Sequence, residues 1–300
     1  MQKNSILRLV VASMATISSS FAADQGAASW AARAISQYFV SSDITYLTAN
    51  NYEAKLDVYR RREGTAPLPT VIYIHGGGWT GGTKGGAVNR LLAWLEMGFN
   101  VVNVEYRLAR VSEAPAAVED CLCALRWVGA HAKDYGFDVN RIVTSGESAG
   151  GHLALTTGMI PESAGLDREC PGAPLPKVAA IVDFYGITDV VDLLDGPNMK
   201  TYAVAWLGSA PNREEIAKRV SPLTYVRAGL PPVISIQGDA DPIVPYSHSI
   251  RLQEALEKVG VPHEMITVPG GKHGTFTADE YAKVFDGIRA FLARYNMLPK

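Results

Sequence analysis

The residues best placed to do chemistry begin with a serine between two glycines. Gly146–Gly150 (GESAG) follows a β-branched run at 142–144 and precedes an apolar stretch with helical spacing. A sharp strand-to-helix turn needs small residues on either side of its central residue, which it holds in a strained, exposed conformation. The free amides and positive end of the following helix favour nearby negative charge. This spacing predicts a nucleophilic role for Ser148.

A serine hydroxyl is a weak nucleophile and needs a base beside it. One histidine, His273, lies in a glycine-rich loop after the last predicted strand, and histidine titrates near neutral pH. The imidazole also needs a partner that fixes its tautomer. Two carboxylates, Asp239 and Asp241, follow the preceding strand, and Asp239 could equally cap its turn. We therefore expect a serine, a histidine and one of these aspartates to act together.

A second glycine-rich segment, His75–Trp79 (HGGGW), follows the buried run Thr70–His75. Three consecutive glycines allow the backbone to turn its amides inward, where they could stabilise an oxyanion. The segment has neither the GxxxxGK[ST] pattern of a phosphate-binding loop nor the GxGxxG spacing of a dinucleotide site. No cysteine or histidine spacing indicates zinc. We therefore expect chemistry without a metal or an organic cofactor.

Short strands alternate with helices along the chain, which predicts a mostly parallel sheet with helices on both faces. Nearly fifty residues, 185–232, interrupt this alternation, and an insertion of that length is typical of a cap or a substrate-binding segment. The eight expected strands are Ile44–Leu47, Ala54–Tyr59, Thr70–His75, Val101–Glu105, Arg141–Ser145, Val178–Phe184, Val233–Gln237 and Glu264–Val268.

The composition excludes several classes of protein. The 300 residues are 47% hydrophobic, so a disordered chain is excluded. The 28 basic and 30 acidic residues leave a net charge of −2, which argues against a nucleic-acid partner. Three cysteines are too few for a disulfide scaffold. Cys170 could pair with Cys121 or Cys123, or all three could be free thiols.

The N-terminal segment has the layout of a secretory signal peptide. Lys3 and Arg8 precede a short apolar stretch, and Ser20-Phe21-Ala22 offers small residues at the two positions that a signal peptidase requires. We expect a leader over residues 1–22, cleavage after Ala22 or Ala23, and a single domain over 23–300. Because no other segment is apolar over about 18 residues, no membrane insertion is expected. The predicted location is secreted or periplasmic.

With these motifs the chain resembles the α/β-hydrolase family, whose chain order is serine, acid, histidine. More narrowly it resembles the hormone-sensitive-lipase-like carboxylesterases, and most of all the bifunctional acetylxylan/feruloyl esterase-like group. The resemblance covers about residues 45–297. It rests on the HGGGW, GESAG, GDADPIVP and GGKHG segments, the turn Glu105–Leu108, and the segments DVNR (138–141), SPLTY (221–225), Pro231-Pro232 and DPIVPYSH (241–248).

This resemblance implies a role for each site residue. Ser148 would be the nucleophile, His273 the general base and acid, and Asp241, rather than Asp239, the residue that orients His273. The oxyanion hole would be formed by the amides of Gly77, Gly78 and Ala149. Supporting roles fall to two further residues, His75, which would hold the loop in shape, and Glu147.

The resemblance also implies a serine carboxylic-ester hydrolase. Its substrate would be a small-molecule or oligosaccharide ester carrying a short acyl, acetyl or feruloyl group. An aromatic substrate wall could include Trp79, Tyr202 and Trp206, although each could instead belong to the core. Two alternatives remain, an amide or formamide hydrolase of the kynurenine-formamidase type and a non-catalytic binding module. The sequence does not indicate the oligomeric state.

Overall fold

The computed structural model describes residues 32, 35–62, 64, 66–170, 172 and 174–299. Through this part of the chain runs one eight-stranded sheet in the order β1-β2-β4-β3-β5-β6-β7-β8. β2 pairs antiparallel with β1 and β4, and all other neighbours are parallel, which confirms the predicted sheet. The strands are β1 (Tyr38–Ala49), β2 (Tyr52–Arg61), β3 (Leu68–Ile74), β4 (Asn100–Val104), β5 (Phe137–Glu147), β6 (Ala180–Phe184), β7 (Val233–Gly238) and β8 (His263–Val268).

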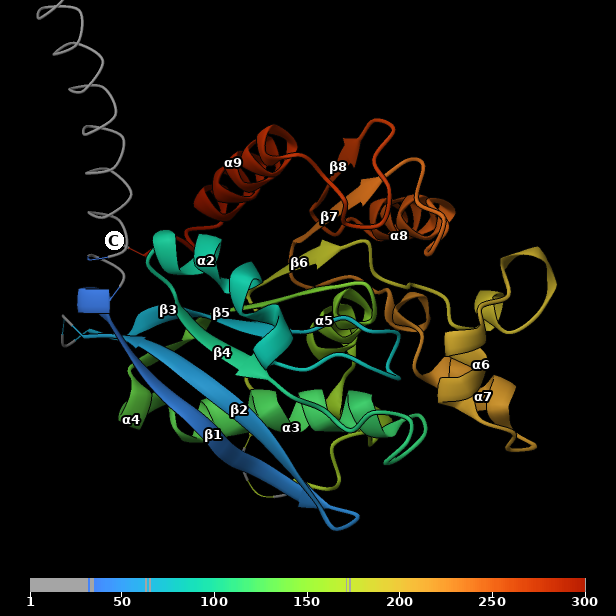
Figure 1. The fold of residues 1–300 in the computed structure, drawn as a ribbon, viewed down its shortest axis with the longest axis horizontal. Coiled ribbons are helices and arrows are strands. Elements are labelled where there is room, and N and C mark those ends of the chain that lie inside the picture. Colours follow the sequence, from blue (N-terminus) through green and yellow to red (C-terminus); the bar gives the residue numbers. More distant parts are fainter. Residues whose placement is uncertain are drawn as a thin grey trace, which may run out of the picture.

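Helices cover both faces of the sheet, as predicted (Figure 1). Alternate strand residues point to opposite faces, so Val71 and Tyr73 of β3 meet α2 and α9, whereas Ile72 and Ile74 meet α3 and α5. Both faces are therefore buried, which explains the nearly continuous apolar run of this strand. The helices are α2 (Val88–Glu96), α3 (Ala116–Ala130), α4 (Ala132–Tyr135), α5 (Ala149–Met159), α6 (Thr201–Leu207), α7 (Arg213–Arg219), α8 (Ser247–Lys258) and α9 (Ala278–Arg294).

The edge strand β1 is longer than the sequence predicts, since it begins at Tyr38 rather than Ile44. Its first half is mostly exposed and carries no apolar alternation that a prediction could use. Backbone pairing with β2 extends the strand there, with a register shift between Ser41 and Ile44.

The insertion at 185–232 contains α6 and α7, which lie together at one side of the molecule (Figure 1). It is fixed to the core by His152 of α5, whose ring Nε2 lies 2.7 Å from the carbonyl of Val220. The insertion therefore packs against α5 of the core.

The predicted leader, residues 1–22, and the cleavage after Ala22 or Ala23 lie outside the described residues. In the part of the chain that the structure describes, every helix is too short or too polar to cross a membrane.

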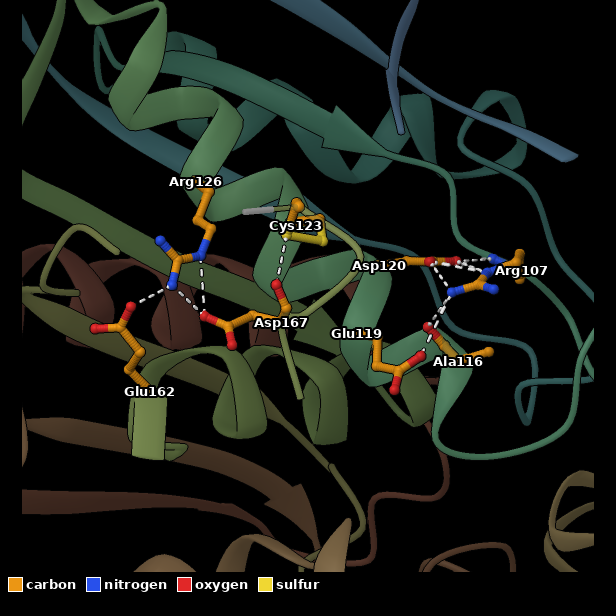
Figure 2. Close-up of a disulfide and its surroundings, with 9 residues drawn as sticks. Arg107, Ala116, Glu119, Asp120, Cys123, Arg126, Glu162 and Asp167 are labelled. Carbon is orange, nitrogen blue, oxygen red and sulfur yellow. Dashed lines mark hydrogen bonds and ion pairs between the residues drawn. A yellow bond between two sulfur atoms is a disulfide. The ribbon is translucent and has the colours of Figure 1, made fainter. Parts of the chain in front are cut away.

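A disulfide joins Cys123 of α3 to Cys170, which decides between the two pairings that the sequence left open (Figure 2). Among the described cysteines Cys121 is free and buried. Beside the disulfide Arg126 forms ion pairs with Asp167 and Glu162, so three bonds attach the loop at 162–170 to α3. At the other end of α3 the buried Asp120 binds Arg107 with an oxygen-to-nitrogen distance of 2.6 Å.

Reduction of this disulfide is expected to destabilise the fold. The bond closes a chain separation of 47 residues, and its loss should lower the free energy of unfolding by about 2–4 kcal/mol, because the unfolded chain regains conformational freedom. Urea denaturation with and without a phosphine reductant measures the difference. The Cys170→Ala variant is the control, because its midpoint should not respond to reductant. A wild-type midpoint that also fails to respond would contradict the prediction.

Candidate active site

Ser148 occupies the turn between β5 and α5 in a strained backbone conformation. Its φ of 58° and ψ of −121° are unusual for a residue other than glycine. A Cβ on Gly146 would lie 2.4 Å from the carbonyl oxygen of Gly150, and one on Gly150 would lie 2.1 Å from that of Ile74. Both glycines are therefore required by close backbone contact, which is the reason that the sequence pattern suggested.

The Gly150→Ala variant is expected to be severely destabilised, by about 3 kcal/mol or more, because β3 or α5 must move to accept the methyl group. Chemical denaturation measures the loss. Gly86→Ala is the matched control, since a Cβ there would lie 3.4 Å from Thr83 Oγ1 and the residue is exposed. Equal stability of the two variants would disprove the account of the turn.

The structure brings Ser148, His273 and Asp241 together, although they are far apart in the chain. His273 Nε2 lies 2.9 Å from Ser148 Oγ, and its Nδ1 lies 2.8 Å from Asp241 Oδ2. The residues follow β5, β8 and β7, whose parallel carboxyl ends meet at one edge of the sheet. This geometry lets a proton pass from the serine to the imidazole while the carboxylate fixes the ring.

Asp241 is held as a carboxylate. Its side chain is fully buried, which by itself would raise its pKa. The hydrogen bond and charge of His273, with the amides of Ile243 and Val244 at 2.8 and 3.1 Å from Oδ1, lower the pKa below its ordinary value instead. Both oxygens of Asp241 therefore have fixed partners, one of which is the imidazole.

The competing aspartate, Asp239, has a different position. It is exposed, and its Oδ1 accepts a hydrogen bond of 2.6 Å from the amide of Gly270. It ties the loop after β7 to the loop after β8, and within the described part of the chain no hydrogen bond or ion pair joins it to His273. The geometry therefore favours Asp241 over Asp239 as the partner of the histidine.

The HGGGW segment lies against the Ser148 turn, as its position after β3 suggests. A Cβ on Gly76 would lie 2.8 Å from the carbonyl oxygen of Glu147. Gly77 and Gly78 have φ values of 121° and 58°, in the region that glycine adopts readily, and both line the cleft at Ser148. Ala149 is the first residue of α5, where the helix leaves its amides free. Gly77 and Gly78 therefore line the same cleft as Ser148, and Ala149 directly follows the serine in the chain.

His75 is buried and holds this loop. Its Nδ1 lies 2.7 Å from the carbonyl oxygen of Gly76, and its ring stacks on Tyr106 at 4.3 Å. Burial lowers the pKa of His75 to about 4, so the ring is neutral at neutral pH. The hydroxyl of Tyr106 in turn donates to the carbonyl of His75. The segment around Tyr106 therefore supports the shape of the glycine loop.

The prediction of an aromatic substrate wall is wrong for Trp79 and Trp206. Both are fully buried and stack on each other at 4.1 Å, and neither lines the cleft. The Nε1 of Trp79 donates to His152, so the pair joins the insertion to α5. The two tryptophan rings therefore pack the insertion against the core. Tyr202 of α6, by contrast, does line the cleft.

Glu147 contacts Tyr185 and Arg90, two residues that the sequence did not single out. The hydroxyl of Tyr185 donates to Glu147 Oε2 at 2.6 Å, and Arg90 Nε lies 3.3 Å from the same oxygen. The Tyr185 ring lies 4.6 Å from the His273 ring. Tyr185 directly follows β6, and this position at the carboxyl end of a strand could have indicated that it lies near the site. Nothing in the local sequence distinguishes Arg90, whose role depends on how α2 packs.

The cleft at Ser148 has a volume of about 570 Å³. Besides the glycine loop, Ser148, His273 and Tyr202, it is lined by the polar side chains of Thr83 and Arg90 and by the apolar ones of Ala87 and Ile243. The described residues contain no group of three histidine, cysteine, aspartate or glutamate side chains placed to hold a metal ion.

A family model named BD-FAE matches residues 56–256, which include Ser148 and Asp241. The chain belongs to the BD-FAE family. Among curated proteins, this BD-FAE chain is 32% identical to the probable carboxylic ester hydrolase LipM of Mycobacterium tuberculosis over 68% of its length and 49% of LipM. It is 28% identical to Esterase LipC of the same organism, over 73% of its length and 56% of LipC. The chain thus spans about half the length of these curated relatives.

Solved structures of esterases have the same fold. Est2 of the planctomycete Thermogutta terrifontis superposes with a TM-score of 0.72 and 28% identity, over 87% of this chain and 95% of Est2. A truncated carbohydrate esterase from gut microbiota gives 0.71 and 25% identity, over 85% of this chain and 96% of that one. The BD-FAE chain is therefore similar to esterases in both sequence and structure.

Proposed function

We propose that this BD-FAE chain is a serine carboxylic-ester hydrolase that uses Ser148, His273 and Asp241. The single observation that carries the proposal is the pair of contacts of His273, 2.9 Å to Ser148 Oγ and 2.8 Å to Asp241 Oδ2. Carboxylic-ester hydrolysis needs an activated nucleophile, an oxyanion site and an acid for the leaving alcohol, and the cleft offers a group for each.

The reaction would proceed through an acyl-enzyme. Ser148 Oγ attacks the ester carbonyl as His273 Nε2 takes the hydroxyl proton, and Asp241 stabilises the imidazolium. The oxyanion accepts hydrogen bonds from the amides of Ala149, Gly77 and Gly78, and such a donor typically contributes about 3 kcal/mol. His273 then protonates the leaving alcohol. In the second half water attacks the acyl group, gives its proton to His273, and the acid leaves as Ser148 is restored.

For the substrate we infer a short-acyl ester, with acetylated or feruloylated saccharides as the natural class. The BD-FAE match and the likeness to a carbohydrate esterase support this class. The cleft also supports it, because Thr83 and Arg90 on its lining offer hydrogen bonds to saccharide hydroxyls.

We further infer that the mature chain works outside the cytosol. The signal-peptide pattern at the N-terminus supports this location. The Cys123–Cys170 disulfide adds support, because disulfides persist mainly in oxidising compartments.

The acyl preference is tested with p-nitrophenyl esters from C2 to C12. We expect kcat/KM to be highest for C2 to C4 and to fall steadily with chain length. Release of acetate and ferulate from xylan fragments, measured beside simple esters, then decides whether saccharide esters are preferred. A maximum at C10 or longer would replace this proposal with a lipase, and an inactive protein that hydrolyses none of the esters would refute it.

A further inference from the structure

Helices α2 and α9 lie side by side on one face of the sheet (Figure 1). Between them is a second cavity, which adjoins the Ser148 cleft. Its volume is about 250 Å³. It shares three lining residues with the Ser148 cleft, Arg90, Glu147 and Tyr185, which form a wall between them. The rest of this α2–α9 cavity is mainly aromatic, with Tyr73, Trp94, Phe184, Tyr281 and Phe285.

In this wall the positive charge of Arg90 and the negative charge of Glu147 neutralise each other. Arg90 Nε lies 3.3 Å from Glu147 Oε2, and Arg90 Nη1 donates to the hydroxyl of Tyr281 at 2.7 Å. The hydroxyl of Tyr185 donates to Glu147, and that of Tyr281 donates to the carbonyl of Gly274. Because the cation and the anion already have each other as partners, a charged ligand would lose its hydration without gaining a counter-ion.

Tyr73 brings a hydroxyl group to the lining of the cavity. Tyr73 of β3 is only 2% exposed, and its hydroxyl has no hydrogen-bond partner among the described residues. Burial, and then the negative charge of Glu147, raises the pKa of Tyr73 well above its ordinary value. The hydroxyl therefore stays protonated and can both donate and accept one hydrogen bond. Water in the cavity can reach this hydroxyl, and a ligand hydroxyl that takes the place of such a water keeps the hydrogen bond while its ring buries apolar surface.

We propose that the α2–α9 cavity is a second binding site, separate from the Ser148 cleft, for a small neutral phenol. A planar ring fits the aromatic walls through stacked and edge-to-face contacts. The ring's hydroxyl would pair with that of Tyr73. The size also fits, because a dry cavity of about 150 Å³ already admits benzene, and 250 Å³ leaves room for ring substituents.

The test is a calorimetric titration of the full chain with p-cresol. We expect saturable binding at millimolar concentrations or below, and about three- to tenfold weaker binding to Tyr73→Phe, which keeps the ring and loses only the hydroxyl. Tyr73 does not line the Ser148 cleft, so this loss would assign the binding to the α2–α9 cavity. The measurement uses no ester and does not depend on the proposed hydrolysis.

A filled cavity gives an independent test. Ala93 of α2 lines the cavity, and Ala93→Phe should abolish p-cresol binding. Ala282→Phe is the matched control on α9, because Ala282 is exposed and lies outside the cavity, so its binding should equal that of the wild type. Circular dichroism checks that both variants fold. The proposal is overturned if no saturable binding occurs, or if p-cresol binds Tyr73→Phe as tightly as the wild type.

Discussion

Replacing Ser148 by alanine is expected to lower kcat for p-nitrophenyl acetate by about 10⁴- to 10⁶-fold. Alanine removes the hydroxyl that lies 2.9 Å from His273 Nε2, and no acyl-enzyme can then form. The fold should be almost unchanged, because alanine keeps the Cβ and replaces one small side chain. We expect the free energy of unfolding to change by less than about 1 kcal/mol.

Initial rates measured with a large excess of enzyme resolve so small a residual activity. Ser247→Ala is the matched control, because Ser247 is an exposed serine at the start of α8, and its kcat should equal that of the wild type. Mass spectrometry after treatment with phenylmethylsulfonyl fluoride should find one adduct, on the peptide that contains Ser148. If Ser148→Ala retains more than a small fraction of the activity, the nucleophile lies elsewhere.

Local chemistry made Ser148 and the sheet predictable. A serine between two glycines needs a strand before it and a helix after it, and both signals are adjacent in the chain. The buried runs of β3, β4 and β7 were visible too, because a strand covered on both faces is mostly apolar. Where burial leaves no pattern, as in the first half of β1, the prediction of the strand was too short.

The sequence alone could not assign roles to the three aromatic residues. Trp79, Tyr202 and Trp206 are all large rings near the glycine loop or in the insertion, and nothing local separates them. Their roles depend on how the insertion packs, which puts the two tryptophans in the core and leaves Tyr202 in the cleft. The sequence does not show the Arg90–Glu147 pair for the same reason, since the pair joins α2 to the end of β5. Only tertiary packing decides these contacts.

The residue types alone left the two aspartates after β7 open, the family resemblance favoured Asp241, and the structure suggests an experiment that separates them. Asp239→Asn keeps an oxygen for the amide of Gly270 and does not touch His273, so kcat should change by less than about threefold. Asp241→Asn is expected to lower kcat by about 10⁴-fold, an effect known for the equivalent change in serine proteases. The comparison uses the same assay and the same chemical change, two residues apart.

The reason for the large effect lies in the hydrogen bonds of Asp241. The amides of Ile243 and Val244 both donate to Oδ1, so an asparagine would keep its oxygen there and turn its NH₂ group toward His273. His273 Nδ1 would then have to accept a hydrogen bond, and the proton would move to Nε2, which could no longer take the proton of Ser148.

The stability of the fold should also respond to pH. The lowered pKa means that Asp241 stabilises the folded state above the ordinary pKa of an aspartate and loses this contribution as the pH falls through its folded-state value. When the free energy of unfolding is measured with urea between pH 3 and 7, it should therefore vary less with pH for Asp241→Asn than for Asp239→Asn. In the kinetic comparison, a large loss of kcat in Asp239→Asn alone would reverse the assignment of the two aspartates.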